Sequence, residues 1–141
     1  MLKTILVALD ASEITERVIQ TLQDLALPKE SKVVLCHVFA PPDTDHELPA
    51  DRPHPKSAEV SYLQIEKQLQ SYQKQLTSNS ELELVTGDPA EEIIRLGNIY
   101  QADLIVIGSR GLTGMKRIVQ GSVSSQVVEE AHCSVLVVKP N

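Results

Sequence analysis

Five short runs of apolar residues divide the chain, and each has the length of a β-strand. They are Ile5 to Leu9, Val33 to Ala40, Leu82 to Val85, Leu104 to Ile107 and Val135 to Val138. The segments between them carry apolar residues at helical spacing. Strands that alternate with helices pair in parallel and are covered by helices on both faces. The pattern therefore predicts an α/β fold with a five-stranded parallel sheet.

The first two helices are predicted from apolar stripes. Ser12 is a good N-cap for the first helix, and Pro28 marks its end. Its stripe consists of Ile14, Val18, Leu22 and Leu25. The second helix has an apolar stripe on a surface otherwise rich in Gln and Lys, formed by Tyr62, Ile65, Leu69, Tyr72 and Leu76. Both stripes are expected to pack against the sheet.

The last two helices are predicted from their start signals. Asp88 is placed to cap the third helix, Pro89 suits its first turn, and Glu91 stands three residues after the cap. The fourth helix follows Gly121 and runs to about Ala131.

Residues 40–57 differ in kind from the rest of the chain. They hold five of the eight prolines, together with several carboxylates and two histidines. The segment has no apolar run and is therefore predicted to be a long loop rather than a second domain. Because its carboxylates and histidines follow no fixed ligand spacing, we interpret it as a solvated loop and not as a metal site.

The character of each run predicts its place in the sheet. Residues 81–84 alternate between Glu and Leu, as in an edge strand with one wet face, whereas residues 5–9 and 104–107 are apolar throughout and belong at the centre. The strand order 3-2-1-4-5 places the third strand at an edge and the first and fourth strands at the centre, as these patterns require. Ligands bind such a sheet beyond the carboxyl ends of the first and fourth strands. Functional residues are therefore expected near Asp10, at the end of the second strand and after Ile107.

Composition narrows the class of protein. The 141 residues are 42% hydrophobic and 23% charged, which fits one ordinary domain and excludes disordered and collagenous chains. No apolar run approaches the roughly 18 residues of a membrane span. A net charge of −6 disfavours nucleic acid as a partner. The start of the chain does not have the pattern of a signal peptide, so a cytoplasmic location is expected. Isolated Cys36 and Cys133 predict reduced structural thiols.

The segment after Ile107 carries the strongest functional signal. Four of the six glycines lie between Gly108 and Gly121, and glycine lets backbone amides approach a ligand closely. A helix follows, and the free amides and positive dipole at its start favour an anion. No acidic residue occurs between positions 103 and 129, whereas three basic residues do: Arg110, Lys116 and Arg117. The segment is therefore predicted to bind phosphate.

Two familiar phosphate-binding motifs do not occur in the sequence. There is no Walker A string, G-x-x-x-x-G-K-[ST]. Nor does a G-x-G-x-x-G follow the first strand, where Asp10-Ala11-Ser12 stands instead.

The glycine spacing matches a third motif. Gly108-x-x-Gly111, nine residues and Gly121-Ser122 fit the G-x-x-G-x9-G-[S/T] signature of the nucleotide-binding branch of the universal stress protein family, which the chain resembles. The resemblance covers essentially all of the chain, and its supporting positions are Asp10-x-Ser12, His37-Val38, Gly87-Asp88-Pro89 and Val135 to Val138. It implies a Rossmann-like domain, usually homodimeric, that binds ATP or a related adenine nucleotide in stress or metabolic signalling. The chain departs from the pattern at Ser134, where many relatives have proline, and in the 40–57 loop.

The resemblance also implies roles for individual residues. Ala8 and Asp10 would face the adenosine, the backbone of Val38 would read the adenine edge, and Ile107 and Gly108 would lie near the ribose. The phosphates would be held by amides and hydroxyls of a larger set, which consists of Gly111, Gly121, Ser122, Val123 and Ser124, with Ser109 and Arg110 in the same loop. Mg²⁺ would accompany the phosphates. The sequence leaves open whether ATP, ADP, AMP or cyclic AMP is preferred, and which downstream protein responds.

Catalysis is not the favoured interpretation. Residues 104–128 contain neither carboxylate nor histidine, whereas nucleotide hydrolysis needs a group that orients water. We expect a nucleotide-binding signalling protein whose ligand changes loop order and partner contacts. The alternative is a slow ATPase, or an autophosphorylating protein that uses Ser122 or Ser124. A phospho-receiver domain is disfavoured, because Asp10-Ala11 and Thr86-Gly87 lack its acidic residues.

The last strand predicts a partner. Val135 to Val138 carries no charge and no proline, the devices that normally protect an edge strand from pairing. A homodimer formed through this strand is therefore expected, with the strand antiparallel to its own copy about a two-fold axis. The alternative is that a helix or the 40–57 loop covers this edge.

Overall fold

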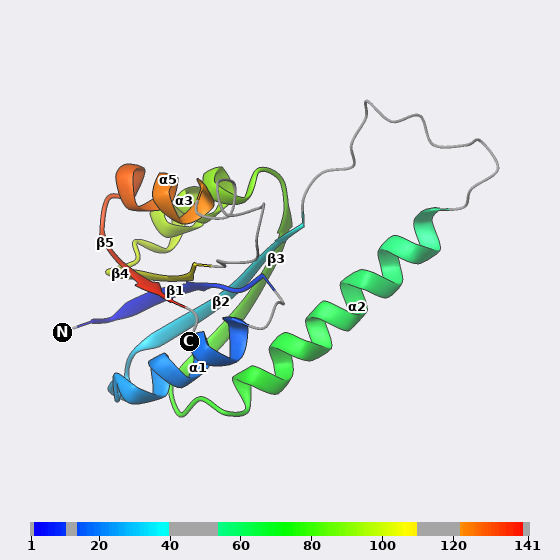
Figure 1. Cartoon of the computed structure of the whole chain (residues 1–141). Coiled ribbons are helices and arrows are strands. Elements are labelled where there is room, and N and C mark those ends of the chain that lie inside the picture. Colours follow the sequence, from blue (N-terminus) through cyan, green and yellow to red (C-terminus); the bar gives the residue numbers. More distant parts are fainter. Residues whose placement is uncertain (1, 11–13, 40–53, 110–121, 140–141) are drawn as a thin grey trace.

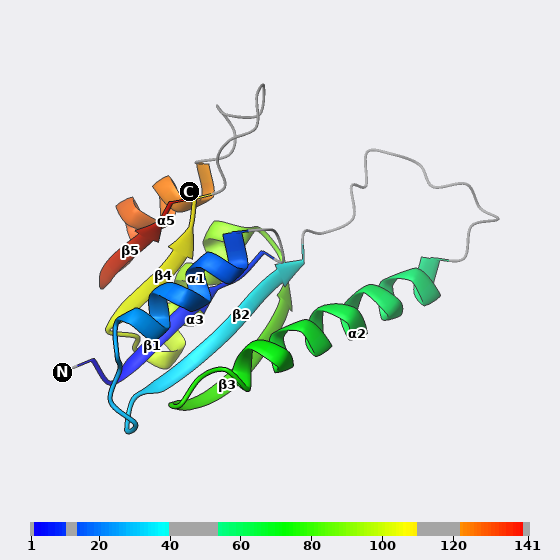
Figure 2. The same ribbon diagram turned by 60° about the horizontal axis from the view of Figure 1, so that its bottom comes forward.

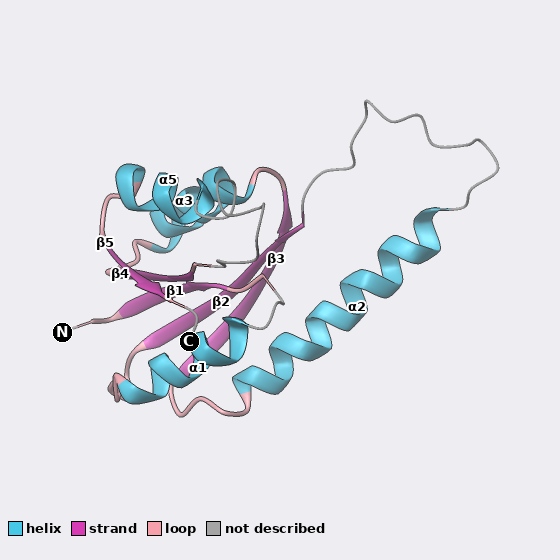
Figure 3. Ribbon diagram, viewed as in Figure 1, coloured by secondary structure: helices cyan, strands magenta, loops and turns pink. Residues whose placement is uncertain are grey.

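The computed structural model describes residues 2–10, 14–39, 54–109 and 122–139 (Figure 1). In chain order the elements are β1 (Thr4–Ala8), α1 (Ile14–Asp24), β2 (Lys32–Phe39), α2 (His54–Gln73), β3 (Asn79–Thr86), α3 (Pro89–Tyr100), β4 (Leu104–Gly108), α5 (Ser122–Glu130) and β5 (Ser134–Val138). Strands and helices alternate, as the apolar pattern predicts (Figure 3).

The five strands form one parallel sheet in the order β3-β2-β1-β4-β5. The predicted fold class and strand order are therefore confirmed. The central strands are the most buried: Ile5, Leu6 and Val7 are inaccessible to solvent, and residues 104–107 are all buried. The edge strands β3 and β5 are mostly half-buried.

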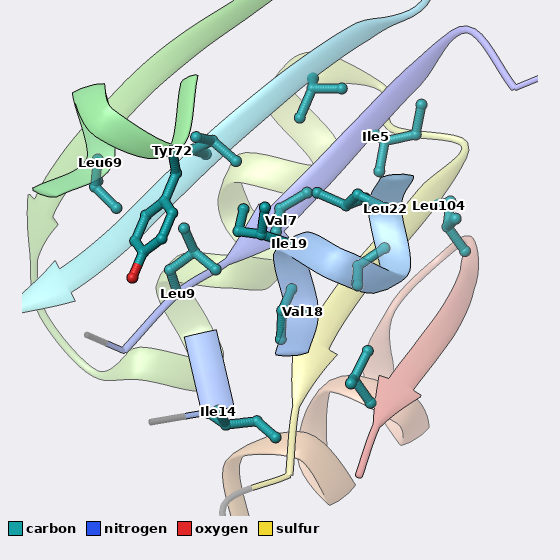
Figure 4. Packing of buried hydrophobic residues seen from close by; sticks show 14 residues of the cluster. Ile5, Val7, Leu9, Ile14, Val18, Ile19, Leu22, Leu69, Tyr72 and Leu104 are labelled. Carbon is teal, nitrogen blue, oxygen red and sulfur yellow. The ribbon is translucent and has the colours of Figure 1, made fainter. Parts of the chain in front are cut away.

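Two layers of helices cover the sheet. Helices α1 and α2 lie on one face and α3 and α5 on the other (Figures 1 and 2). Side chains alternate between the faces along each strand. Ile5 and Val7 pack with Val18 and Leu69 under α1 and α2 (Figure 4), whereas Leu6 packs in the cluster under α3 and α5.

Helix α3 has the predicted cap. The Asp88 carboxylate accepts a hydrogen bond from the Glu91 N–H over 3.1 Å, and Pro89 occupies the first helical position. At the other end Gln101 adopts the left-handed conformation, with φ 52°, and its N–H bonds back to the last turn. Both ends are therefore closed by local hydrogen bonds.

Helix α1 corrects one predicted core residue. Ile14, Val18 and Leu22 are buried as expected, but Leu25 is 41% exposed. The helix ends at Asp24, and Ala26 turns into the left-handed region with φ 50°. The chain therefore leaves the helix before the stripe is complete. The predicted N-cap, Ser12, lies outside the described residues.

Helix α2 corrects two further boundaries. It begins at His54, so residues 54–57, predicted as loop, are helical, and Pro55 falls in the first turn, where proline is tolerated. The helix extends beyond the carboxyl ends of the strands (Figures 1 and 2). Tyr62 is consequently 42% exposed, while Leu69 and Tyr72 pack in the core as expected. Leu76 packs against the same core but follows the end of the helix.

The remaining predictions concern α5 and membrane association. Helix α5 starts directly after Gly121 and ends one residue before the predicted Ala131. None of the helices in the described ranges is both long and apolar enough to cross a membrane. Most of the 40–57 segment, and with it the interpretation of its carboxylates, lies outside the described residues.

Candidate functional site

The carboxyl ends of β1, β2 and β4 meet at one edge of the sheet. Ala8, the last residue of β1, pairs with Cys36 of β2 on one side and with Ile107 of β4 on the other. Val38 therefore lies two residues beyond this level on β2, and Gly108 one residue beyond it on β4. At this edge α1 leaves over one face of the sheet and α5 covers the other (Figure 2).

Four of the predicted site residues share one face. Ile107 belongs to the buried cluster under α3 and α5, and Ala8, Val38 and Val123 pack against that cluster while remaining partly exposed. Asp10 follows the end of β1 and is exposed, and it has an interaction within the protein. The structure thus brings residues from the first, second and fourth strands and from α5 to the same side of the sheet edge.

The junction of β1 and β2 is held by two hydrogen bonds. The Leu9 N–H donates to the Cys36 carbonyl over 2.8 Å. The Leu9 carbonyl accepts from Nδ1 of His37, also over 2.8 Å. A carbonyl can only accept, so Nδ1 must carry the ring proton. The sequence placed His37 beside the site only as part of a family pattern and did not indicate this contact.

An aromatic row supports the His37 ring. It meets Phe39 edge to face, with ring centroids 4.7 Å apart. Phe39 in turn stacks on Tyr62 of α2, with centroids 5.8 Å apart and planes inclined by 21°. The ring of His37 is therefore tied through Phe39 to the helix that extends beyond the sheet.

At the end of β4, helix packing accounts for one glycine. A Cβ at Gly108 would stand 2.8 Å from Cγ1 of Ile14 and 3.3 Å from Cγ2 of Val18. Both side chains belong to α1, so glycine is required there for α1 to approach the sheet. The Ser109 N–H donates to the Val138 carbonyl over 2.8 Å and joins the turn to β5.

The start of α5 faces the same edge. Ser122 is exposed, whereas Ser124 is only 7% exposed and has an interaction within the protein. The first amides of a helix have no partner within the helix and favour an anion. Arg110, Gly111 and Gly121, which sequence analysis assigned to phosphate binding, lie outside the described residues.

The described residues include two cysteines, Cys36 on β2 beside this edge and Cys133 just before β5. Both are free. Burial, and secondarily the charge of Glu83, raises the pKa of the Cys36 thiol to about 12. Partial burial also raises the pKa of Cys133. A thiol that stays protonated at neutral pH is a poor nucleophile, which agrees with the structural role predicted from the sequence.

Comparison with known proteins identifies the family. The model of the universal stress protein family matches residues 1–139. The chain is 32% identical over 150 residues to a universal stress protein of Synechocystis sp., and the match covers 96% of each chain. This chain belongs to the universal stress protein family. A shorter match, 51% identical over 57 residues, covers 40% of this chain and 34% of a Methanocaldococcus jannaschii universal stress protein.

Solved structures agree with this membership. The Methanocaldococcus jannaschii protein MJ0577 has a TM-score of 0.84 at 27% identity, with 100% of this chain and 98% of that chain covered. A universal stress protein from Arabidopsis thaliana with AMP bound has a TM-score of 0.72 at 26% identity, with 99% and 92% covered. A universal stress protein in complex with cAMP, at 21% identity and a TM-score of 0.70, covering 98% and 97%, shares the fold.

Proposed function

We propose that this universal stress protein binds an adenine nucleotide at the carboxyl edge of β1, β2 and β4. One observation carries the proposal: Asp10, Val38 and the start of α5 come from distant parts of the sequence and lie at that one edge. The binding of AMP by one relative and of cAMP by another supports the ligand class. AMP and cAMP share the adenine base and the ribose but differ in how the phosphate is attached to the ribose. The contacts to the base and the ribose are therefore the part of the site that both ligands would use.

The polar groups at this edge match the ribose and the phosphate of an adenine nucleotide. The Asp10 carboxylate accepts hydrogen bonds from the ribose hydroxyls. The amides and hydroxyls of α5 hold phosphate, together with Ser109, Arg110, Gly111 and Gly121 of the preceding segment. The described residues contain no cluster of three His, Cys, Asp or Glu side chains that could hold a metal ion. Mg²⁺ would therefore take its oxygen ligands mainly from phosphates and water.

Adenine preference follows from the main chain of Val38. Its N–H and C=O face the same neighbour, as they do for every residue of a parallel strand. They offer one donor and one acceptor, which match the acceptor and the amino donor on the adenine edge. Guanine presents the reverse arrangement and would leave both groups unpaired, which is costly in a buried contact. ATP should therefore outcompete GTP in calorimetry, and equal competition would contradict this contact.

Thermal melting and calorimetry with ATP and AMP test the binding itself. At a hundredfold excess over Kd, a ligand that binds only the folded state stabilises it by about 2.7 kcal/mol. Gly121→Val places a side chain where phosphate is proposed to bind, and Asp10→Asn removes the ribose acceptor. Asp24→Asn, at the end of α1, removes the same charge away from the edge and is the matched control. Undiminished affinity in folded Gly121→Val and Asp10→Asn variants would refute the site.

The second candidate function is slow hydrolysis or autophosphorylation. Of the two serines considered, Ser122 is exposed and Ser124 is almost fully buried, so Ser122 is the better acceptor of a phosphoryl group. Mass spectrometry of the purified protein separates the candidates. Intact nucleotide in stoichiometric amount supports binding alone. ADP together with a phosphate on Ser122 supports the alternative.

We propose further that nucleotide binding controls contacts with other proteins. The support is that the proposed phosphate-binding segment joins β4 to α5 in the sequence, so a ligand held there would contact the connection between two elements of the fold. We propose also that the protein forms a homodimer through β5, that it acts on a downstream protein not yet identified, and that it is located in the cytoplasm. Cell fractionation tests the location, and affinity capture from the fraction that contains the protein, with and without ATP, tests for the downstream protein. The homodimer is tested below.

A further inference from the structure

The ladder between β1 and β2 stops at Leu9. The Leu9 N–H donates to the Cys36 carbonyl, as expected in a parallel ladder in which Ala8 and Cys36 are partners. In such a ladder the main-chain groups of every second residue face the same neighbouring strand. Those of Cys36 face β1, and so the N–H and C=O of Val38 also face that side, beyond the end of β1.

The next bond of the ladder is replaced. In register it would run from the Val38 N–H to the Leu9 carbonyl. Within the part of the chain that the structure describes, no main-chain hydrogen bond joins these two residues. The Leu9 carbonyl instead accepts from Nδ1 of His37 over 2.8 Å. A side-chain donor thus bonds to the carbonyl at the position where the ladder would place the Val38 N–H.

We propose that His37 is a positioning residue for base recognition, whose imidazole occupies the Leu9 carbonyl and so keeps the Val38 N–H available to the adenine edge. The proposal rests on the adenine site proposed above. It also gives Leu9 a fixed orientation immediately before Asp10, so that the base contact and the ribose contact are set by one hydrogen bond.

The surroundings of the ring favour this role. His37 is half-buried, and its edge-to-face contact with Phe39 restricts its rotation. Phe39 is itself stacked on Tyr62 of α2. A ring restrained in this way loses little further freedom when it holds the carbonyl. Replacing the imidazole by phenyl keeps the aromatic contact and removes only the donor.

Amide hydrogen exchange on the ligand-free protein tests the replaced bond directly. In the unmodified protein the Val38 amide should exchange at least tenfold faster than the Cys36 amide, which lies inside the ladder. In His37→Phe the Leu9 carbonyl has no side-chain donor, so the Val38 N–H should bond to it and exchange at least tenfold more slowly than in the unmodified protein. His37→Asn, which retains an N–H donor near the position of Nδ1, should restore fast exchange.

Calorimetry tests the consequence for the base. His37→Phe should weaken ATP binding about tenfold, the effect of one lost hydrogen bond. It should leave unchanged the affinity for tripolyphosphate, which lacks base and ribose. His37→Asn should bind ATP within about threefold of the unmodified protein. His132→Phe, a substitution of an exposed histidine at the other end of the sheet, is the matched control.

The outcomes are distinct. Slow exchange of the Val38 amide in the unmodified protein would overturn the proposal without any variant, and so would full ATP affinity in His37→Phe. An equal loss of ATP and tripolyphosphate affinity would show a general structural effect and would also overturn it. Failure of the unmodified protein to bind any adenine nucleotide would refute the proposed function and the base contact together, while the exchange pattern would still reveal whether His37 interrupts the ladder.

Discussion

The two edge strands of the sheet, β3 and β5, differ in the charge and the side-chain contacts along their outer edges. β3 carries Glu81 and Glu83, and its edge is contacted by a side chain from α2. Nε2 of Gln73 donates to the Ser80 carbonyl over 3.3 Å and to the Ser80 hydroxyl over 3.1 Å. β5 is apolar from Val135 to Val138. Charge and coverage discourage strand pairing, and an apolar edge invites it.

The β3 edge also has a network on the α3 side of the sheet. The Tyr100 hydroxyl donates to the Glu83 carboxylate. Nζ of Lys32 lies 2.6 Å from the Glu81 carboxylate and 4.9 Å from the centre of the Tyr100 ring. Three elements, β2, β3 and α3, thus share one set of polar contacts. The comparison shows charge and a covering side chain on β3 and an apolar strand in β5, and this difference supports the homodimer proposed through β5.

The largest expected effect is the loss of the proposed homodimer on substitution of Val137 by proline. The Val138 carbonyl accepts from the N–H of Ser109, which follows β4, so the main-chain groups of Val138 face β4. Those of the preceding residue, Val137, therefore face the opposite way, toward the outer edge of the sheet. Proline there removes a donor in both copies. We expect the dissociation constant of the dimer to rise at least a hundredfold, which corresponds to about 2.7 kcal/mol. Sedimentation at micromolar concentration measures it.

Leu84→Pro is the matched control on β3. The Gly87 N–H donates to the Phe39 carbonyl, so the groups of Leu84 also alternate to the outer edge. The mass of this variant should equal that of the unmodified protein. A monomeric unmodified protein, or an equal loss of association in both variants, would contradict the difference between the edges.

A smaller effect is expected from Tyr100→Phe. The change removes the donor to Glu83 and leaves a partly buried carboxylate with one hydrogen bond fewer. We expect the free energy of unfolding to fall by about 1–2 kcal/mol, with no change in dimer mass, because the network belongs to the β3 edge. Urea unfolding measures the first quantity and sedimentation the second. An unchanged midpoint of unfolding would show that the network does not stabilise this edge.

The same contact predicts a pH dependence. The hydrogen bond to Glu83, helped by partial burial and by nearby negative charge, raises the pKa of Tyr100 to about 12 from its ordinary value of 10.0. Since the folded state holds the phenol proton more tightly than the unfolded state, the contribution is complete below pH 10 and is lost as the pH rises to 12. The stability difference between the unmodified protein and Tyr100→Phe should shrink over that range. A constant difference would contradict the assignment.

The smallest effect is expected from Lys32→Met. The Lys32 and Glu81 side chains are 41% and 49% exposed, and exposed ion pairs contribute about 0–1 kcal/mol. Methionine keeps most of the apolar stem, so unfolding in urea should shift by less than about 0.5 kcal/mol. A loss of more than 2 kcal/mol would mean that the β3 network depends on the charge of Lys32 rather than on Tyr100 and Glu83.

Several features were predicted correctly because they depend on neighbours in the sequence. The alternation of residues 81–84 predicted an edge strand, and the continuous apolar runs predicted central ones. The cap of α3 was recognised from Asp88, Pro89 and Glu91, which lie within one helical turn. The positions of Asp10 and the α5 start followed from strand order alone. Leu25 and Tyr62 were misplaced because periodicity does not reveal where a helix ends or outruns the sheet.

The sequence by itself therefore determined the strand order, the capped helix and the edge of the sheet at which the proposed site residues lie. Only the tertiary structure decided which chemistry each residue has there. Gly108 is glycine because Ile14 of α1 occupies the space beside it, and His37 holds the end of β1 because its ring reaches the carbonyl of Leu9, which is 28 residues away in the chain. Hydrophobic pattern and capping act over a few residues, whereas a contact between two strands exists only once the sheet has brought them together.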